Sequence, residues 1–533
     1  MIQTILLNGN FITLDAAMPR ASAVAISYGR LAAVGDNAEI ARLAGRGTSI
    51  INLDGKTALP GLSDAHLHWQ AQAQSMRSVD VFELPSKADA LERVRQRAQQ
   101  TPPGEWVTGQ GWAQELWAER AFPSRADLDA VAPQNPVYLS AKSGHAAWVN
   151  SRALSLAGVA DSTPDPDGGE ILRDKNGAAT GILLETAMDL VSERVPTPSP
   201  EELADMMQAA QTHALQRGLT MIHDFDDPSC LVALQILRER GDLCLRVVKQ
   251  INQQWLEAAL ASGIRRNFGD DWIRIGALKL FADGALGPKT ALMFEVYAGE
   301  DWNTGMAVVD KETMVDYVCR ASAAGLPSSI HAIGDKAVHD VLDVFEIARG
   351  QEAARGEARS SRRHRIEHVQ IIHPQDSHRL AALGVIASMQ PIHATSDMVM
   401  ADRYWGERAK WAYNPRLQLD YGARVAFGSD APVEPLDPLL GIHAAVTRQR
   451  HGEPAGGWHP EARISLQEAL LGYTQGPAYA AEMEDRLGML RAGYLADLVL
   501  LDRDITLAPA EEIPALQILG TMVDGEWRYR NFD

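Results

Sequence analysis

The stretch LPGLSDAHLHW (Leu59–Trp69) is an apolar run that opens with a proline and a glycine and contains two histidines one residue apart. A short apolar run bounded by turn residues is typical of a buried strand. Side chains two positions apart on a strand point to the same face, so His66 and His68 are expected to project together from its carboxyl end. Two imidazoles there can share a metal ion, or they can be an ordinary hydrogen-bonded pair.

Seven further apolar runs follow this stretch, separated by segments with helical patterning. They span residues 219–226, 245–252, 273–284, 326–334, 364–372, 384–393 and 423–433. One helix is predicted between the N-cap Ser199 and the stop residue Gly218, and another between Asp335 and Gly350. The polar segment 348–363 is predicted to be a solvated loop. Eight alternating strand and helix units predict an α/β protein with a distorted (β/α)₈ TIM barrel.

The two ends of the chain have a different pattern, with short apolar stretches broken by glycine-containing turns. Neither end is large enough to bury a core alone. We therefore predict a small composite β-sandwich domain from both termini, residues 1–58 and 485–533, beside a barrel domain over residues 59–484. An insertion at about 69–198 interrupts the barrel pattern after its first strand. An insertion that follows a barrel strand is expected at the catalytic mouth.

Composition excludes several classes of protein. Of the 533 residues, 46% are hydrophobic and 22% charged, as in an ordinary soluble globular protein. A net charge of −19 argues against nucleic acid and anionic membranes as partners, because such binders concentrate lysine and arginine. Three cysteines without a CxxC pattern indicate neither a disulfide framework nor a thiolate zinc site. The N-terminal stretch lacks the features of a secretory signal, so we expect a cytoplasmic protein.

Metal-ligating residue types recur at the ends of later strands. His331 and His368 end the fifth and sixth predicted strands, and Asp430 ends the eighth. If the barrel closes, these residues meet His66 and His68 at one rim. Neutral imidazole and carboxylate are ligands that Zn²⁺ and similar divalent ions prefer, and the lack of thiolates argues against a purely structural zinc.

The motifs LPGLSDAHLH, KLFADGALG, IHAIGD, RIEHVQ and FGSDAPVEPLDPL occur in this order along the chain. Their order and spacing resemble the amidohydrolase superfamily, and more closely its family 3 branch, which includes N-substituted formamide deformylases. The resemblance covers nearly the whole chain. It implies a metal-dependent hydrolase that uses metal-activated water to cleave a carbon–nitrogen bond other than a peptide bond, in a small amide or N-substituted formamide.

The resemblance also implies ligand roles. His66 and His68 would hold one metal and His331 and His368 a second, while Asp430 would bind metal and act as the catalytic base. The metal would be Zn²⁺, as one or two ions, with other divalent metals possible. His145, within the insertion, is a second catalytic candidate that would orient the substrate oxygen. The alternative for His145 is a plain structural hydrogen bond.

Lys279 lies on the fourth predicted strand, where related enzymes often carry a carboxylated lysine that bridges two metals. Alternation places Lys279 on one face with Ile275 and Ala277, and apolar neighbours disfavour a charged amine. A neutral amine can add carbon dioxide and become an anionic ligand. The alternatives are an ordinary lysine paired with Asp283 or Glu185, and a site with one metal.

Other residues are candidates for supporting roles or for lining a pocket. His223 and Asp224 end the second predicted strand and would support the ligands. Gln390 and His393 would line the pocket from the seventh. Trp69, Trp112, Trp117, Trp405 and Trp411 are candidates either for an apolar pocket or for core packing.

Three rival functions remain at this stage. The same metal centre can hydrolyse cyclic amides or deaminate a ring amidine, and a metal-free barrel scaffold is the non-enzymatic alternative. An iron oxygenase is disfavoured because it would leave His331 and His368 without a role. A homo-oligomer is compatible with the sequence.

Overall fold

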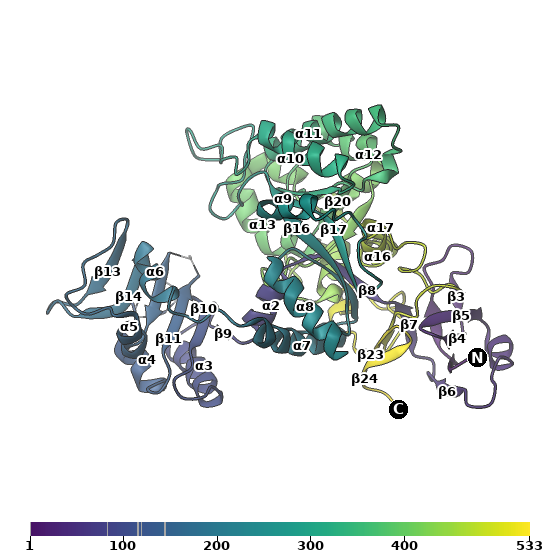
Figure 1. Cartoon of the computed structure of the whole chain (residues 1–533), viewed down its shortest axis with the longest axis horizontal. Coiled ribbons are helices and arrows are strands. Elements are labelled where there is room, and N and C mark those ends of the chain that lie inside the picture. The colour runs from purple at the N-terminus through teal and green to yellow at the C-terminus, as the bar shows by residue number, and fades with distance from the viewer. Residues whose placement is uncertain (1, 83, 115–116, 119, 143–144) are drawn as a thin grey trace. The chain divides into compact units, whose positions relative to one another are not determined.

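The structure is a computed structural model that describes residues 2–82, 84–114, 117–118, 120–142 and 145–533. The chain forms two compact units (Figure 1). One contains Met1–Gln70 and Met207–Asp533, and the other contains Ala71–Met206. Each unit is described by itself.

Eight parallel strands in the described part of the first unit form a barrel sheet in which each strand pairs with the next along the chain. They are β8 (Leu62–Leu67), β15 (Leu219–Asp224), β16 (Arg246–Asn252), β17 (Ile273–Phe281), β18 (Ser328–Ala332), β19 (Arg365–His368), β20 (Ile386–Met389) and β21 (Val425–Phe427). The backbone N–H of Asp430 donates to His66 O over 2.7 Å, and that of His68 donates to Ala431 O over 2.8 Å. These bonds bring the last strand to the first, which confirms the predicted barrel.

Helices follow the strands, as repeated strand–helix units require (Figure 1). The principal ones are α7 (Pro200–Gln216), α8 (Pro228–Arg240), α10 (Lys311–Ala323), α11 (Asp335–Ala354), α13 (Pro391–Trp405) and α15 (Pro438–Thr447). Helix α7 begins as predicted, because the Ser199 hydroxyl accepts from the Glu202 N–H over 3.2 Å. Gly218, just beyond its end, has a φ of +78°. No helix of the described residues combines the length and apolarity needed to cross a lipid bilayer.

The prediction for residues 348–363 was wrong in two respects. Helix α11 continues past Gly350 to Ala354, and the side chains of Arg349 and Glu352 are buried rather than solvated. Arg349 Nη1 donates to Glu352 Oε2 over 2.6 Å, one helical turn apart. This ion pair is buried against the rest of the unit, although most residues from Gly350 to Ser360 are exposed as predicted.

The two chain ends build β sheets together. One sheet has the order β5-β4-β1-β6, and the other has the order β24-β23-β22-β7-β2-β3. The strands are β1 (Thr4–Leu7), β2 (Asn10–Ile12), β3 (Arg20–Ala21), β4 (Ala23–Ser27), β5 (Arg30–Gly35), β6 (Ser49–Asn52), β7 (Thr57–Pro60), β22 (Leu498–Leu501), β23 (Ile518–Val523) and β24 (Glu526–Arg530). Antiparallel pairing sets Leu498 opposite Pro60, and one apolar core holds Phe11 and Met522. These sheets confirm the composite β fold predicted for the two termini, while the domain bounds 1–58 and 485–533 stay a prediction.

Strand β7 of this β domain leads directly into barrel strand β8 through Gly61. A Cβ at Gly61 would lie 2.3 Å from Thr220 Oγ1, so only glycine permits this approach to β15. The barrel and the β domain are also joined by a buried ion pair, in which Arg246 Nε and Nη2 contact the Asp497 carboxylate at 2.7 and 2.9 Å.

The second unit has its own sheet and core. Six strands of its described residues pair in the order β13-β14-β12-β11-β10-β9. They are β9 (Val79–Asp80), β10 (Val107–Trp112), β11 (Val137–Ala141), β12 (Ala146–Val149), β13 (Gly169–Arg173) and β14 (Ala179–Glu185), accompanied by α3 (Lys87–Gln100), α4 (Arg125–Val131) and α5 (Ser151–Ala157). Trp112, Trp117 and Trp148 are buried together in its core. Core packing is therefore the role that the structure gives to Trp112 and Trp117.

Candidate metal centre

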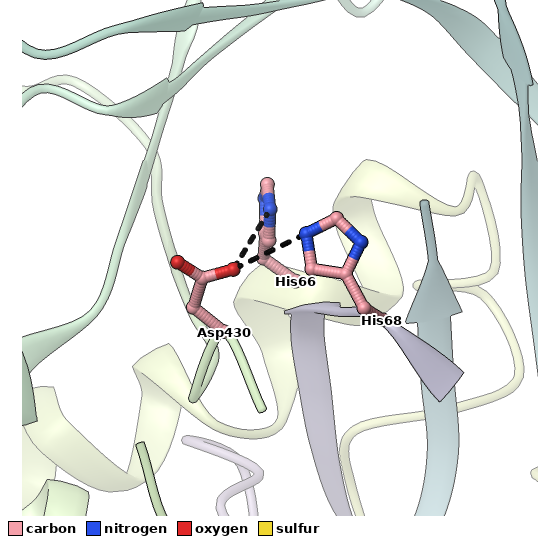
Figure 2. Close-up of side chains that lie close together, drawn as sticks. All are labelled: His66, His68 and Asp430. Atoms are coloured by element: carbon pink, nitrogen blue, oxygen red, sulfur yellow. Dashed lines mark ion pairs between the residues drawn. The ribbon is translucent and has the colours of Figure 1, made fainter. Parts of the chain in front are cut away.

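His66, His68 and Asp430 meet at the carboxyl end of the barrel (Figure 2). Asp430 Oδ1 lies 3.5 Å from Nε2 of His66 and 3.5 Å from Nε2 of His68. Asp430 follows β21 with a φ of +61°, a left-handed conformation that non-glycine residues rarely adopt. Burial raises the pKa of Asp430, but a hydrogen bond from His68 and the surrounding imidazoles outweigh burial and hold this pKa well below its ordinary value.

His66 has one satisfied and one unsatisfied ring nitrogen. Its Nδ1 lies 2.6 Å from Glu367 Oε2. Burial lowers the pKa of His66 to about 4, so the imidazole is neutral at pH 7. Its Nε2 is buried and has no hydrogen-bond partner among the described residues. A lone pair facing a carboxylate in this way fits a divalent cation, because a metal ion satisfies both groups.

His68 follows β8 and is held by a different carboxylate. Its Nδ1 lies 3.2 Å from Asp226 Oδ1. Burial lowers the pKa of His68, but bonds to Asp226 and Asp430 outweigh burial and raise this pKa to about 9. The site therefore attracts positive charge, and a cation bound there would compete with this proton.

A second group of possible ligands shares Asp430. Nitrogens of His368 and His393 lie within 4.8 Å of each other and of an Asp430 oxygen. His368 ends β19 with a φ of +74°, and its Nδ1 lies 2.9 Å from Gln390 Oε1. His393 Nε2 is 3.7 Å from Asp430 Oδ2. The sequence had suggested His393 only as a pocket residue.

His331 lies beside this second group. Its ring centroid is 4.6 Å from that of His368, but its Nε2 is 2.9 Å from the carbonyl oxygen of Gly284. The sequence gives no sign of this bond, because the loop that supplies Gly284 is brought to His331 only by the folded barrel.

Lys279 is buried near the same centre. Its Nζ lies 4.4 Å from the ring centroid of Phe281 and 4.8 Å from that of Phe225, which stacks on His66. Burial lowers the pKa of Lys279 to about 8. Asp283, one suggested partner for an ordinary lysine, accepts from the backbone N–H groups of Leu292, Ile333 and Gly334 instead.

Glu367, like Asp226 and Arg365, belongs to this site but was not predicted from the sequence. It is fully buried, and both its carboxylate oxygens are held by Arg365, two positions earlier on β19. Burial raises the pKa of Glu367, but Arg365 and His66 outweigh burial and hold it well below its ordinary value. The available signal was a pair of opposite charges on the same face of a predicted buried strand.

The strand-end residues His223 and Asp224 lie within the same buried polar network. His223 Nδ1 is 3.0 Å from Arg365 Nη1. Asp224 pairs with Lys249 at 2.8 Å and accepts from the Trp69 N–H over 2.9 Å.

His145 belongs to the second unit. Its imidazole is exposed, and its Nδ1 lies 3.0 Å from Glu185 Oε2. Its assignment as a catalytic residue stays a prediction.

Comparisons with known proteins identify the family of the chain. The family model of the amidohydrolase family matches residues 49–529. The chain is 34% identical to the protein LONG AFTER FAR-RED 3 of Arabidopsis thaliana, over 98% of this chain and 91% of that protein. It is 31% identical to an N-substituted formamide deformylase of Arthrobacter pascens, over 99% of this chain and 98% of that enzyme. The crystal structure of an uncharacterized metal-dependent hydrolase from Pyrococcus furiosus superposes with a TM-score of 0.77 and 31% identity, covering 94% of this chain and 99% of that one.

Proposed function

This chain belongs to the amidohydrolase family and is a metal-dependent hydrolase, and on that premise we propose that it hydrolyses the carbon–nitrogen bond of a small amide or N-substituted formamide. The observation that carries the proposal is the convergence of His66, His68 and Asp430, with a neutral imidazole lone pair left unsatisfied beside a carboxylate. Similarity to the formamide deformylase supports the bond class.

The ligands proposed for one divalent ion are His66, His68 and Asp430. A second ion would be held by Asp430 with His368 and either His393 or His331. When bound, a divalent ion such as Zn²⁺ supplies a Lewis acid that makes water nucleophilic at neutral pH and polarises a carbonyl oxygen.

Asp430 is the proposed proton carrier. Its carboxylate accepts a proton from the attacking water and passes that proton to the nitrogen of the leaving amine. Its buried position keeps the transferred proton from bulk water, and the flanking imidazoles favour return of the carboxylate to its charged form.

Lys279 is proposed to carry a carboxylate derived from carbon dioxide. Its neutral amine nitrogen attacks the carbon of CO₂, a C–N bond forms, and one proton leaves to solvent. The product is an anionic ligand suited to two cations. The burial of Lys279 supports this proposal, because loss of water around the amine favours its neutral form over the ammonium ion.

The test is a substrate panel on the full-length chain. Protein stripped of metal with a chelator is reloaded with Zn²⁺ or Co²⁺ and incubated with N-formyl and N-acyl amines, and the released amine is measured. We expect amine release from the reloaded protein and none from the stripped protein. Cyclic amides and ring amidines are tested in parallel, and ring opening of the former or ammonia release from the latter, without action on the first set, would favour the rival reactions on the same centre. Reloaded protein that acts on no member of any set would contradict the proposal.

The acidic net charge and the three cysteines without a disulfide pattern support two further proposals. We propose a cytoplasmic enzyme whose partner is a small molecule rather than nucleic acid or a membrane surface.

A further inference from the structure

The strongest unassigned feature of the molecule is the carboxylate beneath the proposed metal ligands. Glu367 lies inside the barrel, and His66 Nδ1 is 2.6 Å from its Oε2. Arg365 Nη2 donates to the same oxygen over 2.8 Å. The Ser329 hydroxyl and Arg365 Nε donate to the other oxygen. Every contact made by this carboxylate is with a donor.

These contacts determine which nitrogen of His66 carries the proton. An ionised carboxylate can only accept hydrogen bonds, so His66 must donate from Nδ1. A neutral imidazole with its proton on Nδ1 has its lone pair on Nε2. That lone pair faces Asp430, whose Oδ1 is 3.5 Å away.

The carboxylate is itself fixed by neighbouring strands. Arg365 Nη2 donates to the Ala65 carbonyl on β8 and to the Ser388 hydroxyl on β20, each over 2.6 Å. With Ser329 on β18 and His223 on β15, contacts from four other strands hold the Glu367–Arg365 pair of β19. A carboxylate anchored in this way can restrain the plane of the His66 ring as well as its tautomer.

We propose that Glu367 is a positioning residue that fixes His66 in the Nδ1–H tautomer and aims its Nε2 at the metal. This inference rests on the proposed metal centre and adds a determinant of metal affinity that lies outside the ligand set. Partners of this kind typically contribute 10- to 100-fold in affinity.

The chain contains a matched control. Glu352 is also buried and contacts one histidine, one arginine and one serine: His364 Nε2 at 2.9 Å, Arg349 Nη1 at 2.6 Å and Ser322 Oγ at 2.6 Å. The difference lies in the second ring nitrogen. Nδ1 of His364 accepts from the Ser328 N–H over 3.0 Å, so this imidazole has no lone pair left for a ligand.

The experiment compares Glu367→Gln with Glu352→Gln in the full-length, metal-stripped chain. Co²⁺ is titrated against a competing chromophoric chelator, and the visible absorption of the bound cobalt is recorded. We expect Glu367→Gln to bind Co²⁺ at least about tenfold more weakly with an altered cobalt spectrum, and Glu352→Gln to bind within about twofold of wild type. Thermal unfolding of the metal-free proteins reports folding separately.

Three results separate the possible failures. Glu367→Gln binding as tightly as wild type, or equal losses in both variants, overturns the role of Glu367 alone. A wild-type chain that binds no Co²⁺ overturns the metal centre and this inference together. If Glu367→Gln does not fold, ¹⁵N-histidine spectra of the metal-free wild type decide, with His66 assigned by comparison with His66→Gln. The Nδ1–H tautomer supports the proposal, and the Nε2–H tautomer overturns it.

Discussion

Two buried glutamates of this chain have nearly the same partners and different consequences. Glu367 and Glu352 each hold a histidine, an arginine and a serine away from water. The cluster around Glu352 uses both nitrogens of His364, whereas Nε2 of His66 beside Glu367 has no hydrogen-bond partner in the described part of the chain. Because buried polar atoms are nearly always paired, an unsatisfied nitrogen beside the Asp430 carboxylate supports the proposed role of His66 as a metal ligand. The partners of the two glutamates are therefore alike. The clusters differ in whether the second ring nitrogen of the histidine remains available to bind a ligand.

Backbone conformation also differs between the surroundings of Glu352 and the barrel rim near His66. Arg349 and Glu352 occupy regular turns of α11, and Ser322 lies in α10. Near His66, Asp430 and His368 have φ values of +61° and +74°. Such conformations are unfavourable for residues with a side chain and persist where the surrounding structure enforces them, often at functional sites. The barrel rim therefore holds strain that the Glu352 cluster lacks.

The largest effect is expected at Asp430, whose carboxylate lies beside His66 Nε2. Replacing Asp430 by Asn removes the proposed proton carrier while keeping its shape. Hydrolysis should fall by about 10²- to 10⁴-fold, the range attributed to a general acid–base group. Steady-state kinetics at saturating metal measures this loss, with circular dichroism confirming an intact fold. Activity within tenfold of wild type would place proton transfer elsewhere.

The second-largest effect is a loss of stability, expected when the cluster around Glu352 is disrupted. Glu352→Ala leaves Arg349 buried without its carboxylate, which should lower the free energy of unfolding by about 3 kcal/mol. Co²⁺ affinity should not change, because no proposed ligand contacts Glu352. Urea unfolding and cobalt titration on the same preparation measure the two quantities. A variant that is as stable as wild type but binds cobalt more weakly would contradict the assignment of the Glu352 cluster to stability alone.

Lowering the pH should also reduce the stabilisation that the cluster around Glu352 provides. Burial raises the pKa of Glu352, but bonds from His364, Ser322 and Arg349 outweigh it and lower this pKa from 4.5 to about 2. The unfolded chain therefore takes up the proton first, so the stabilisation is complete above about pH 4.5 and disappears toward pH 2. Burial lowers the pKa of His364, which adds loss in the same direction. Wild type should lose more stability than Glu352→Gln between pH 5 and pH 3 in thermal unfolding scans, and parallel curves would contradict this assignment.

The smallest effects are expected from the two serines. Ser322→Ala and Ser329→Ala each remove one hydroxyl from a buried glutamate, a change worth about 1 kcal/mol. Ser322→Ala should lower stability only, whereas Ser329→Ala should also weaken Co²⁺ binding by a few fold. Equal cobalt affinities in the two variants would show that the hydroxyl on Glu367 does not influence His66.

The sequence was informative about the barrel for a physical reason. Apolar runs of strand length that alternate with helices have few other ways to bury their faces, and the carboxyl ends of parallel strands must meet at one rim. His66, His68 and Asp430 could therefore be placed together from their positions at strand ends. His368 could be placed beside them in the same way.

The partners of buried charged side chains could not be predicted from positions at strand ends. Glu367 adjoins a predicted ligand, but its contact with His66 exists only because β8 and β19 face one another across the closed barrel. Residues 348–363 are strongly polar, and solvation is the ordinary fate of such a segment. Burial of Arg349 and Glu352 depends on Ser322 and His364, which come from other elements. Sequence alone does not reveal which charges have found partners.

The most direct test of the account is the location of bound metal in a crystal of the full-length wild type, purified without added metal and measured with anomalous scattering at metal edges. We expect at least one peak bonded to His66 Nε2, His68 and Asp430, with Glu367 on the opposite nitrogen of His66. A protein without a metal peak at this position after soaking in Zn²⁺ or Co²⁺, or with water alone bound to His66 Nε2, would contradict the account.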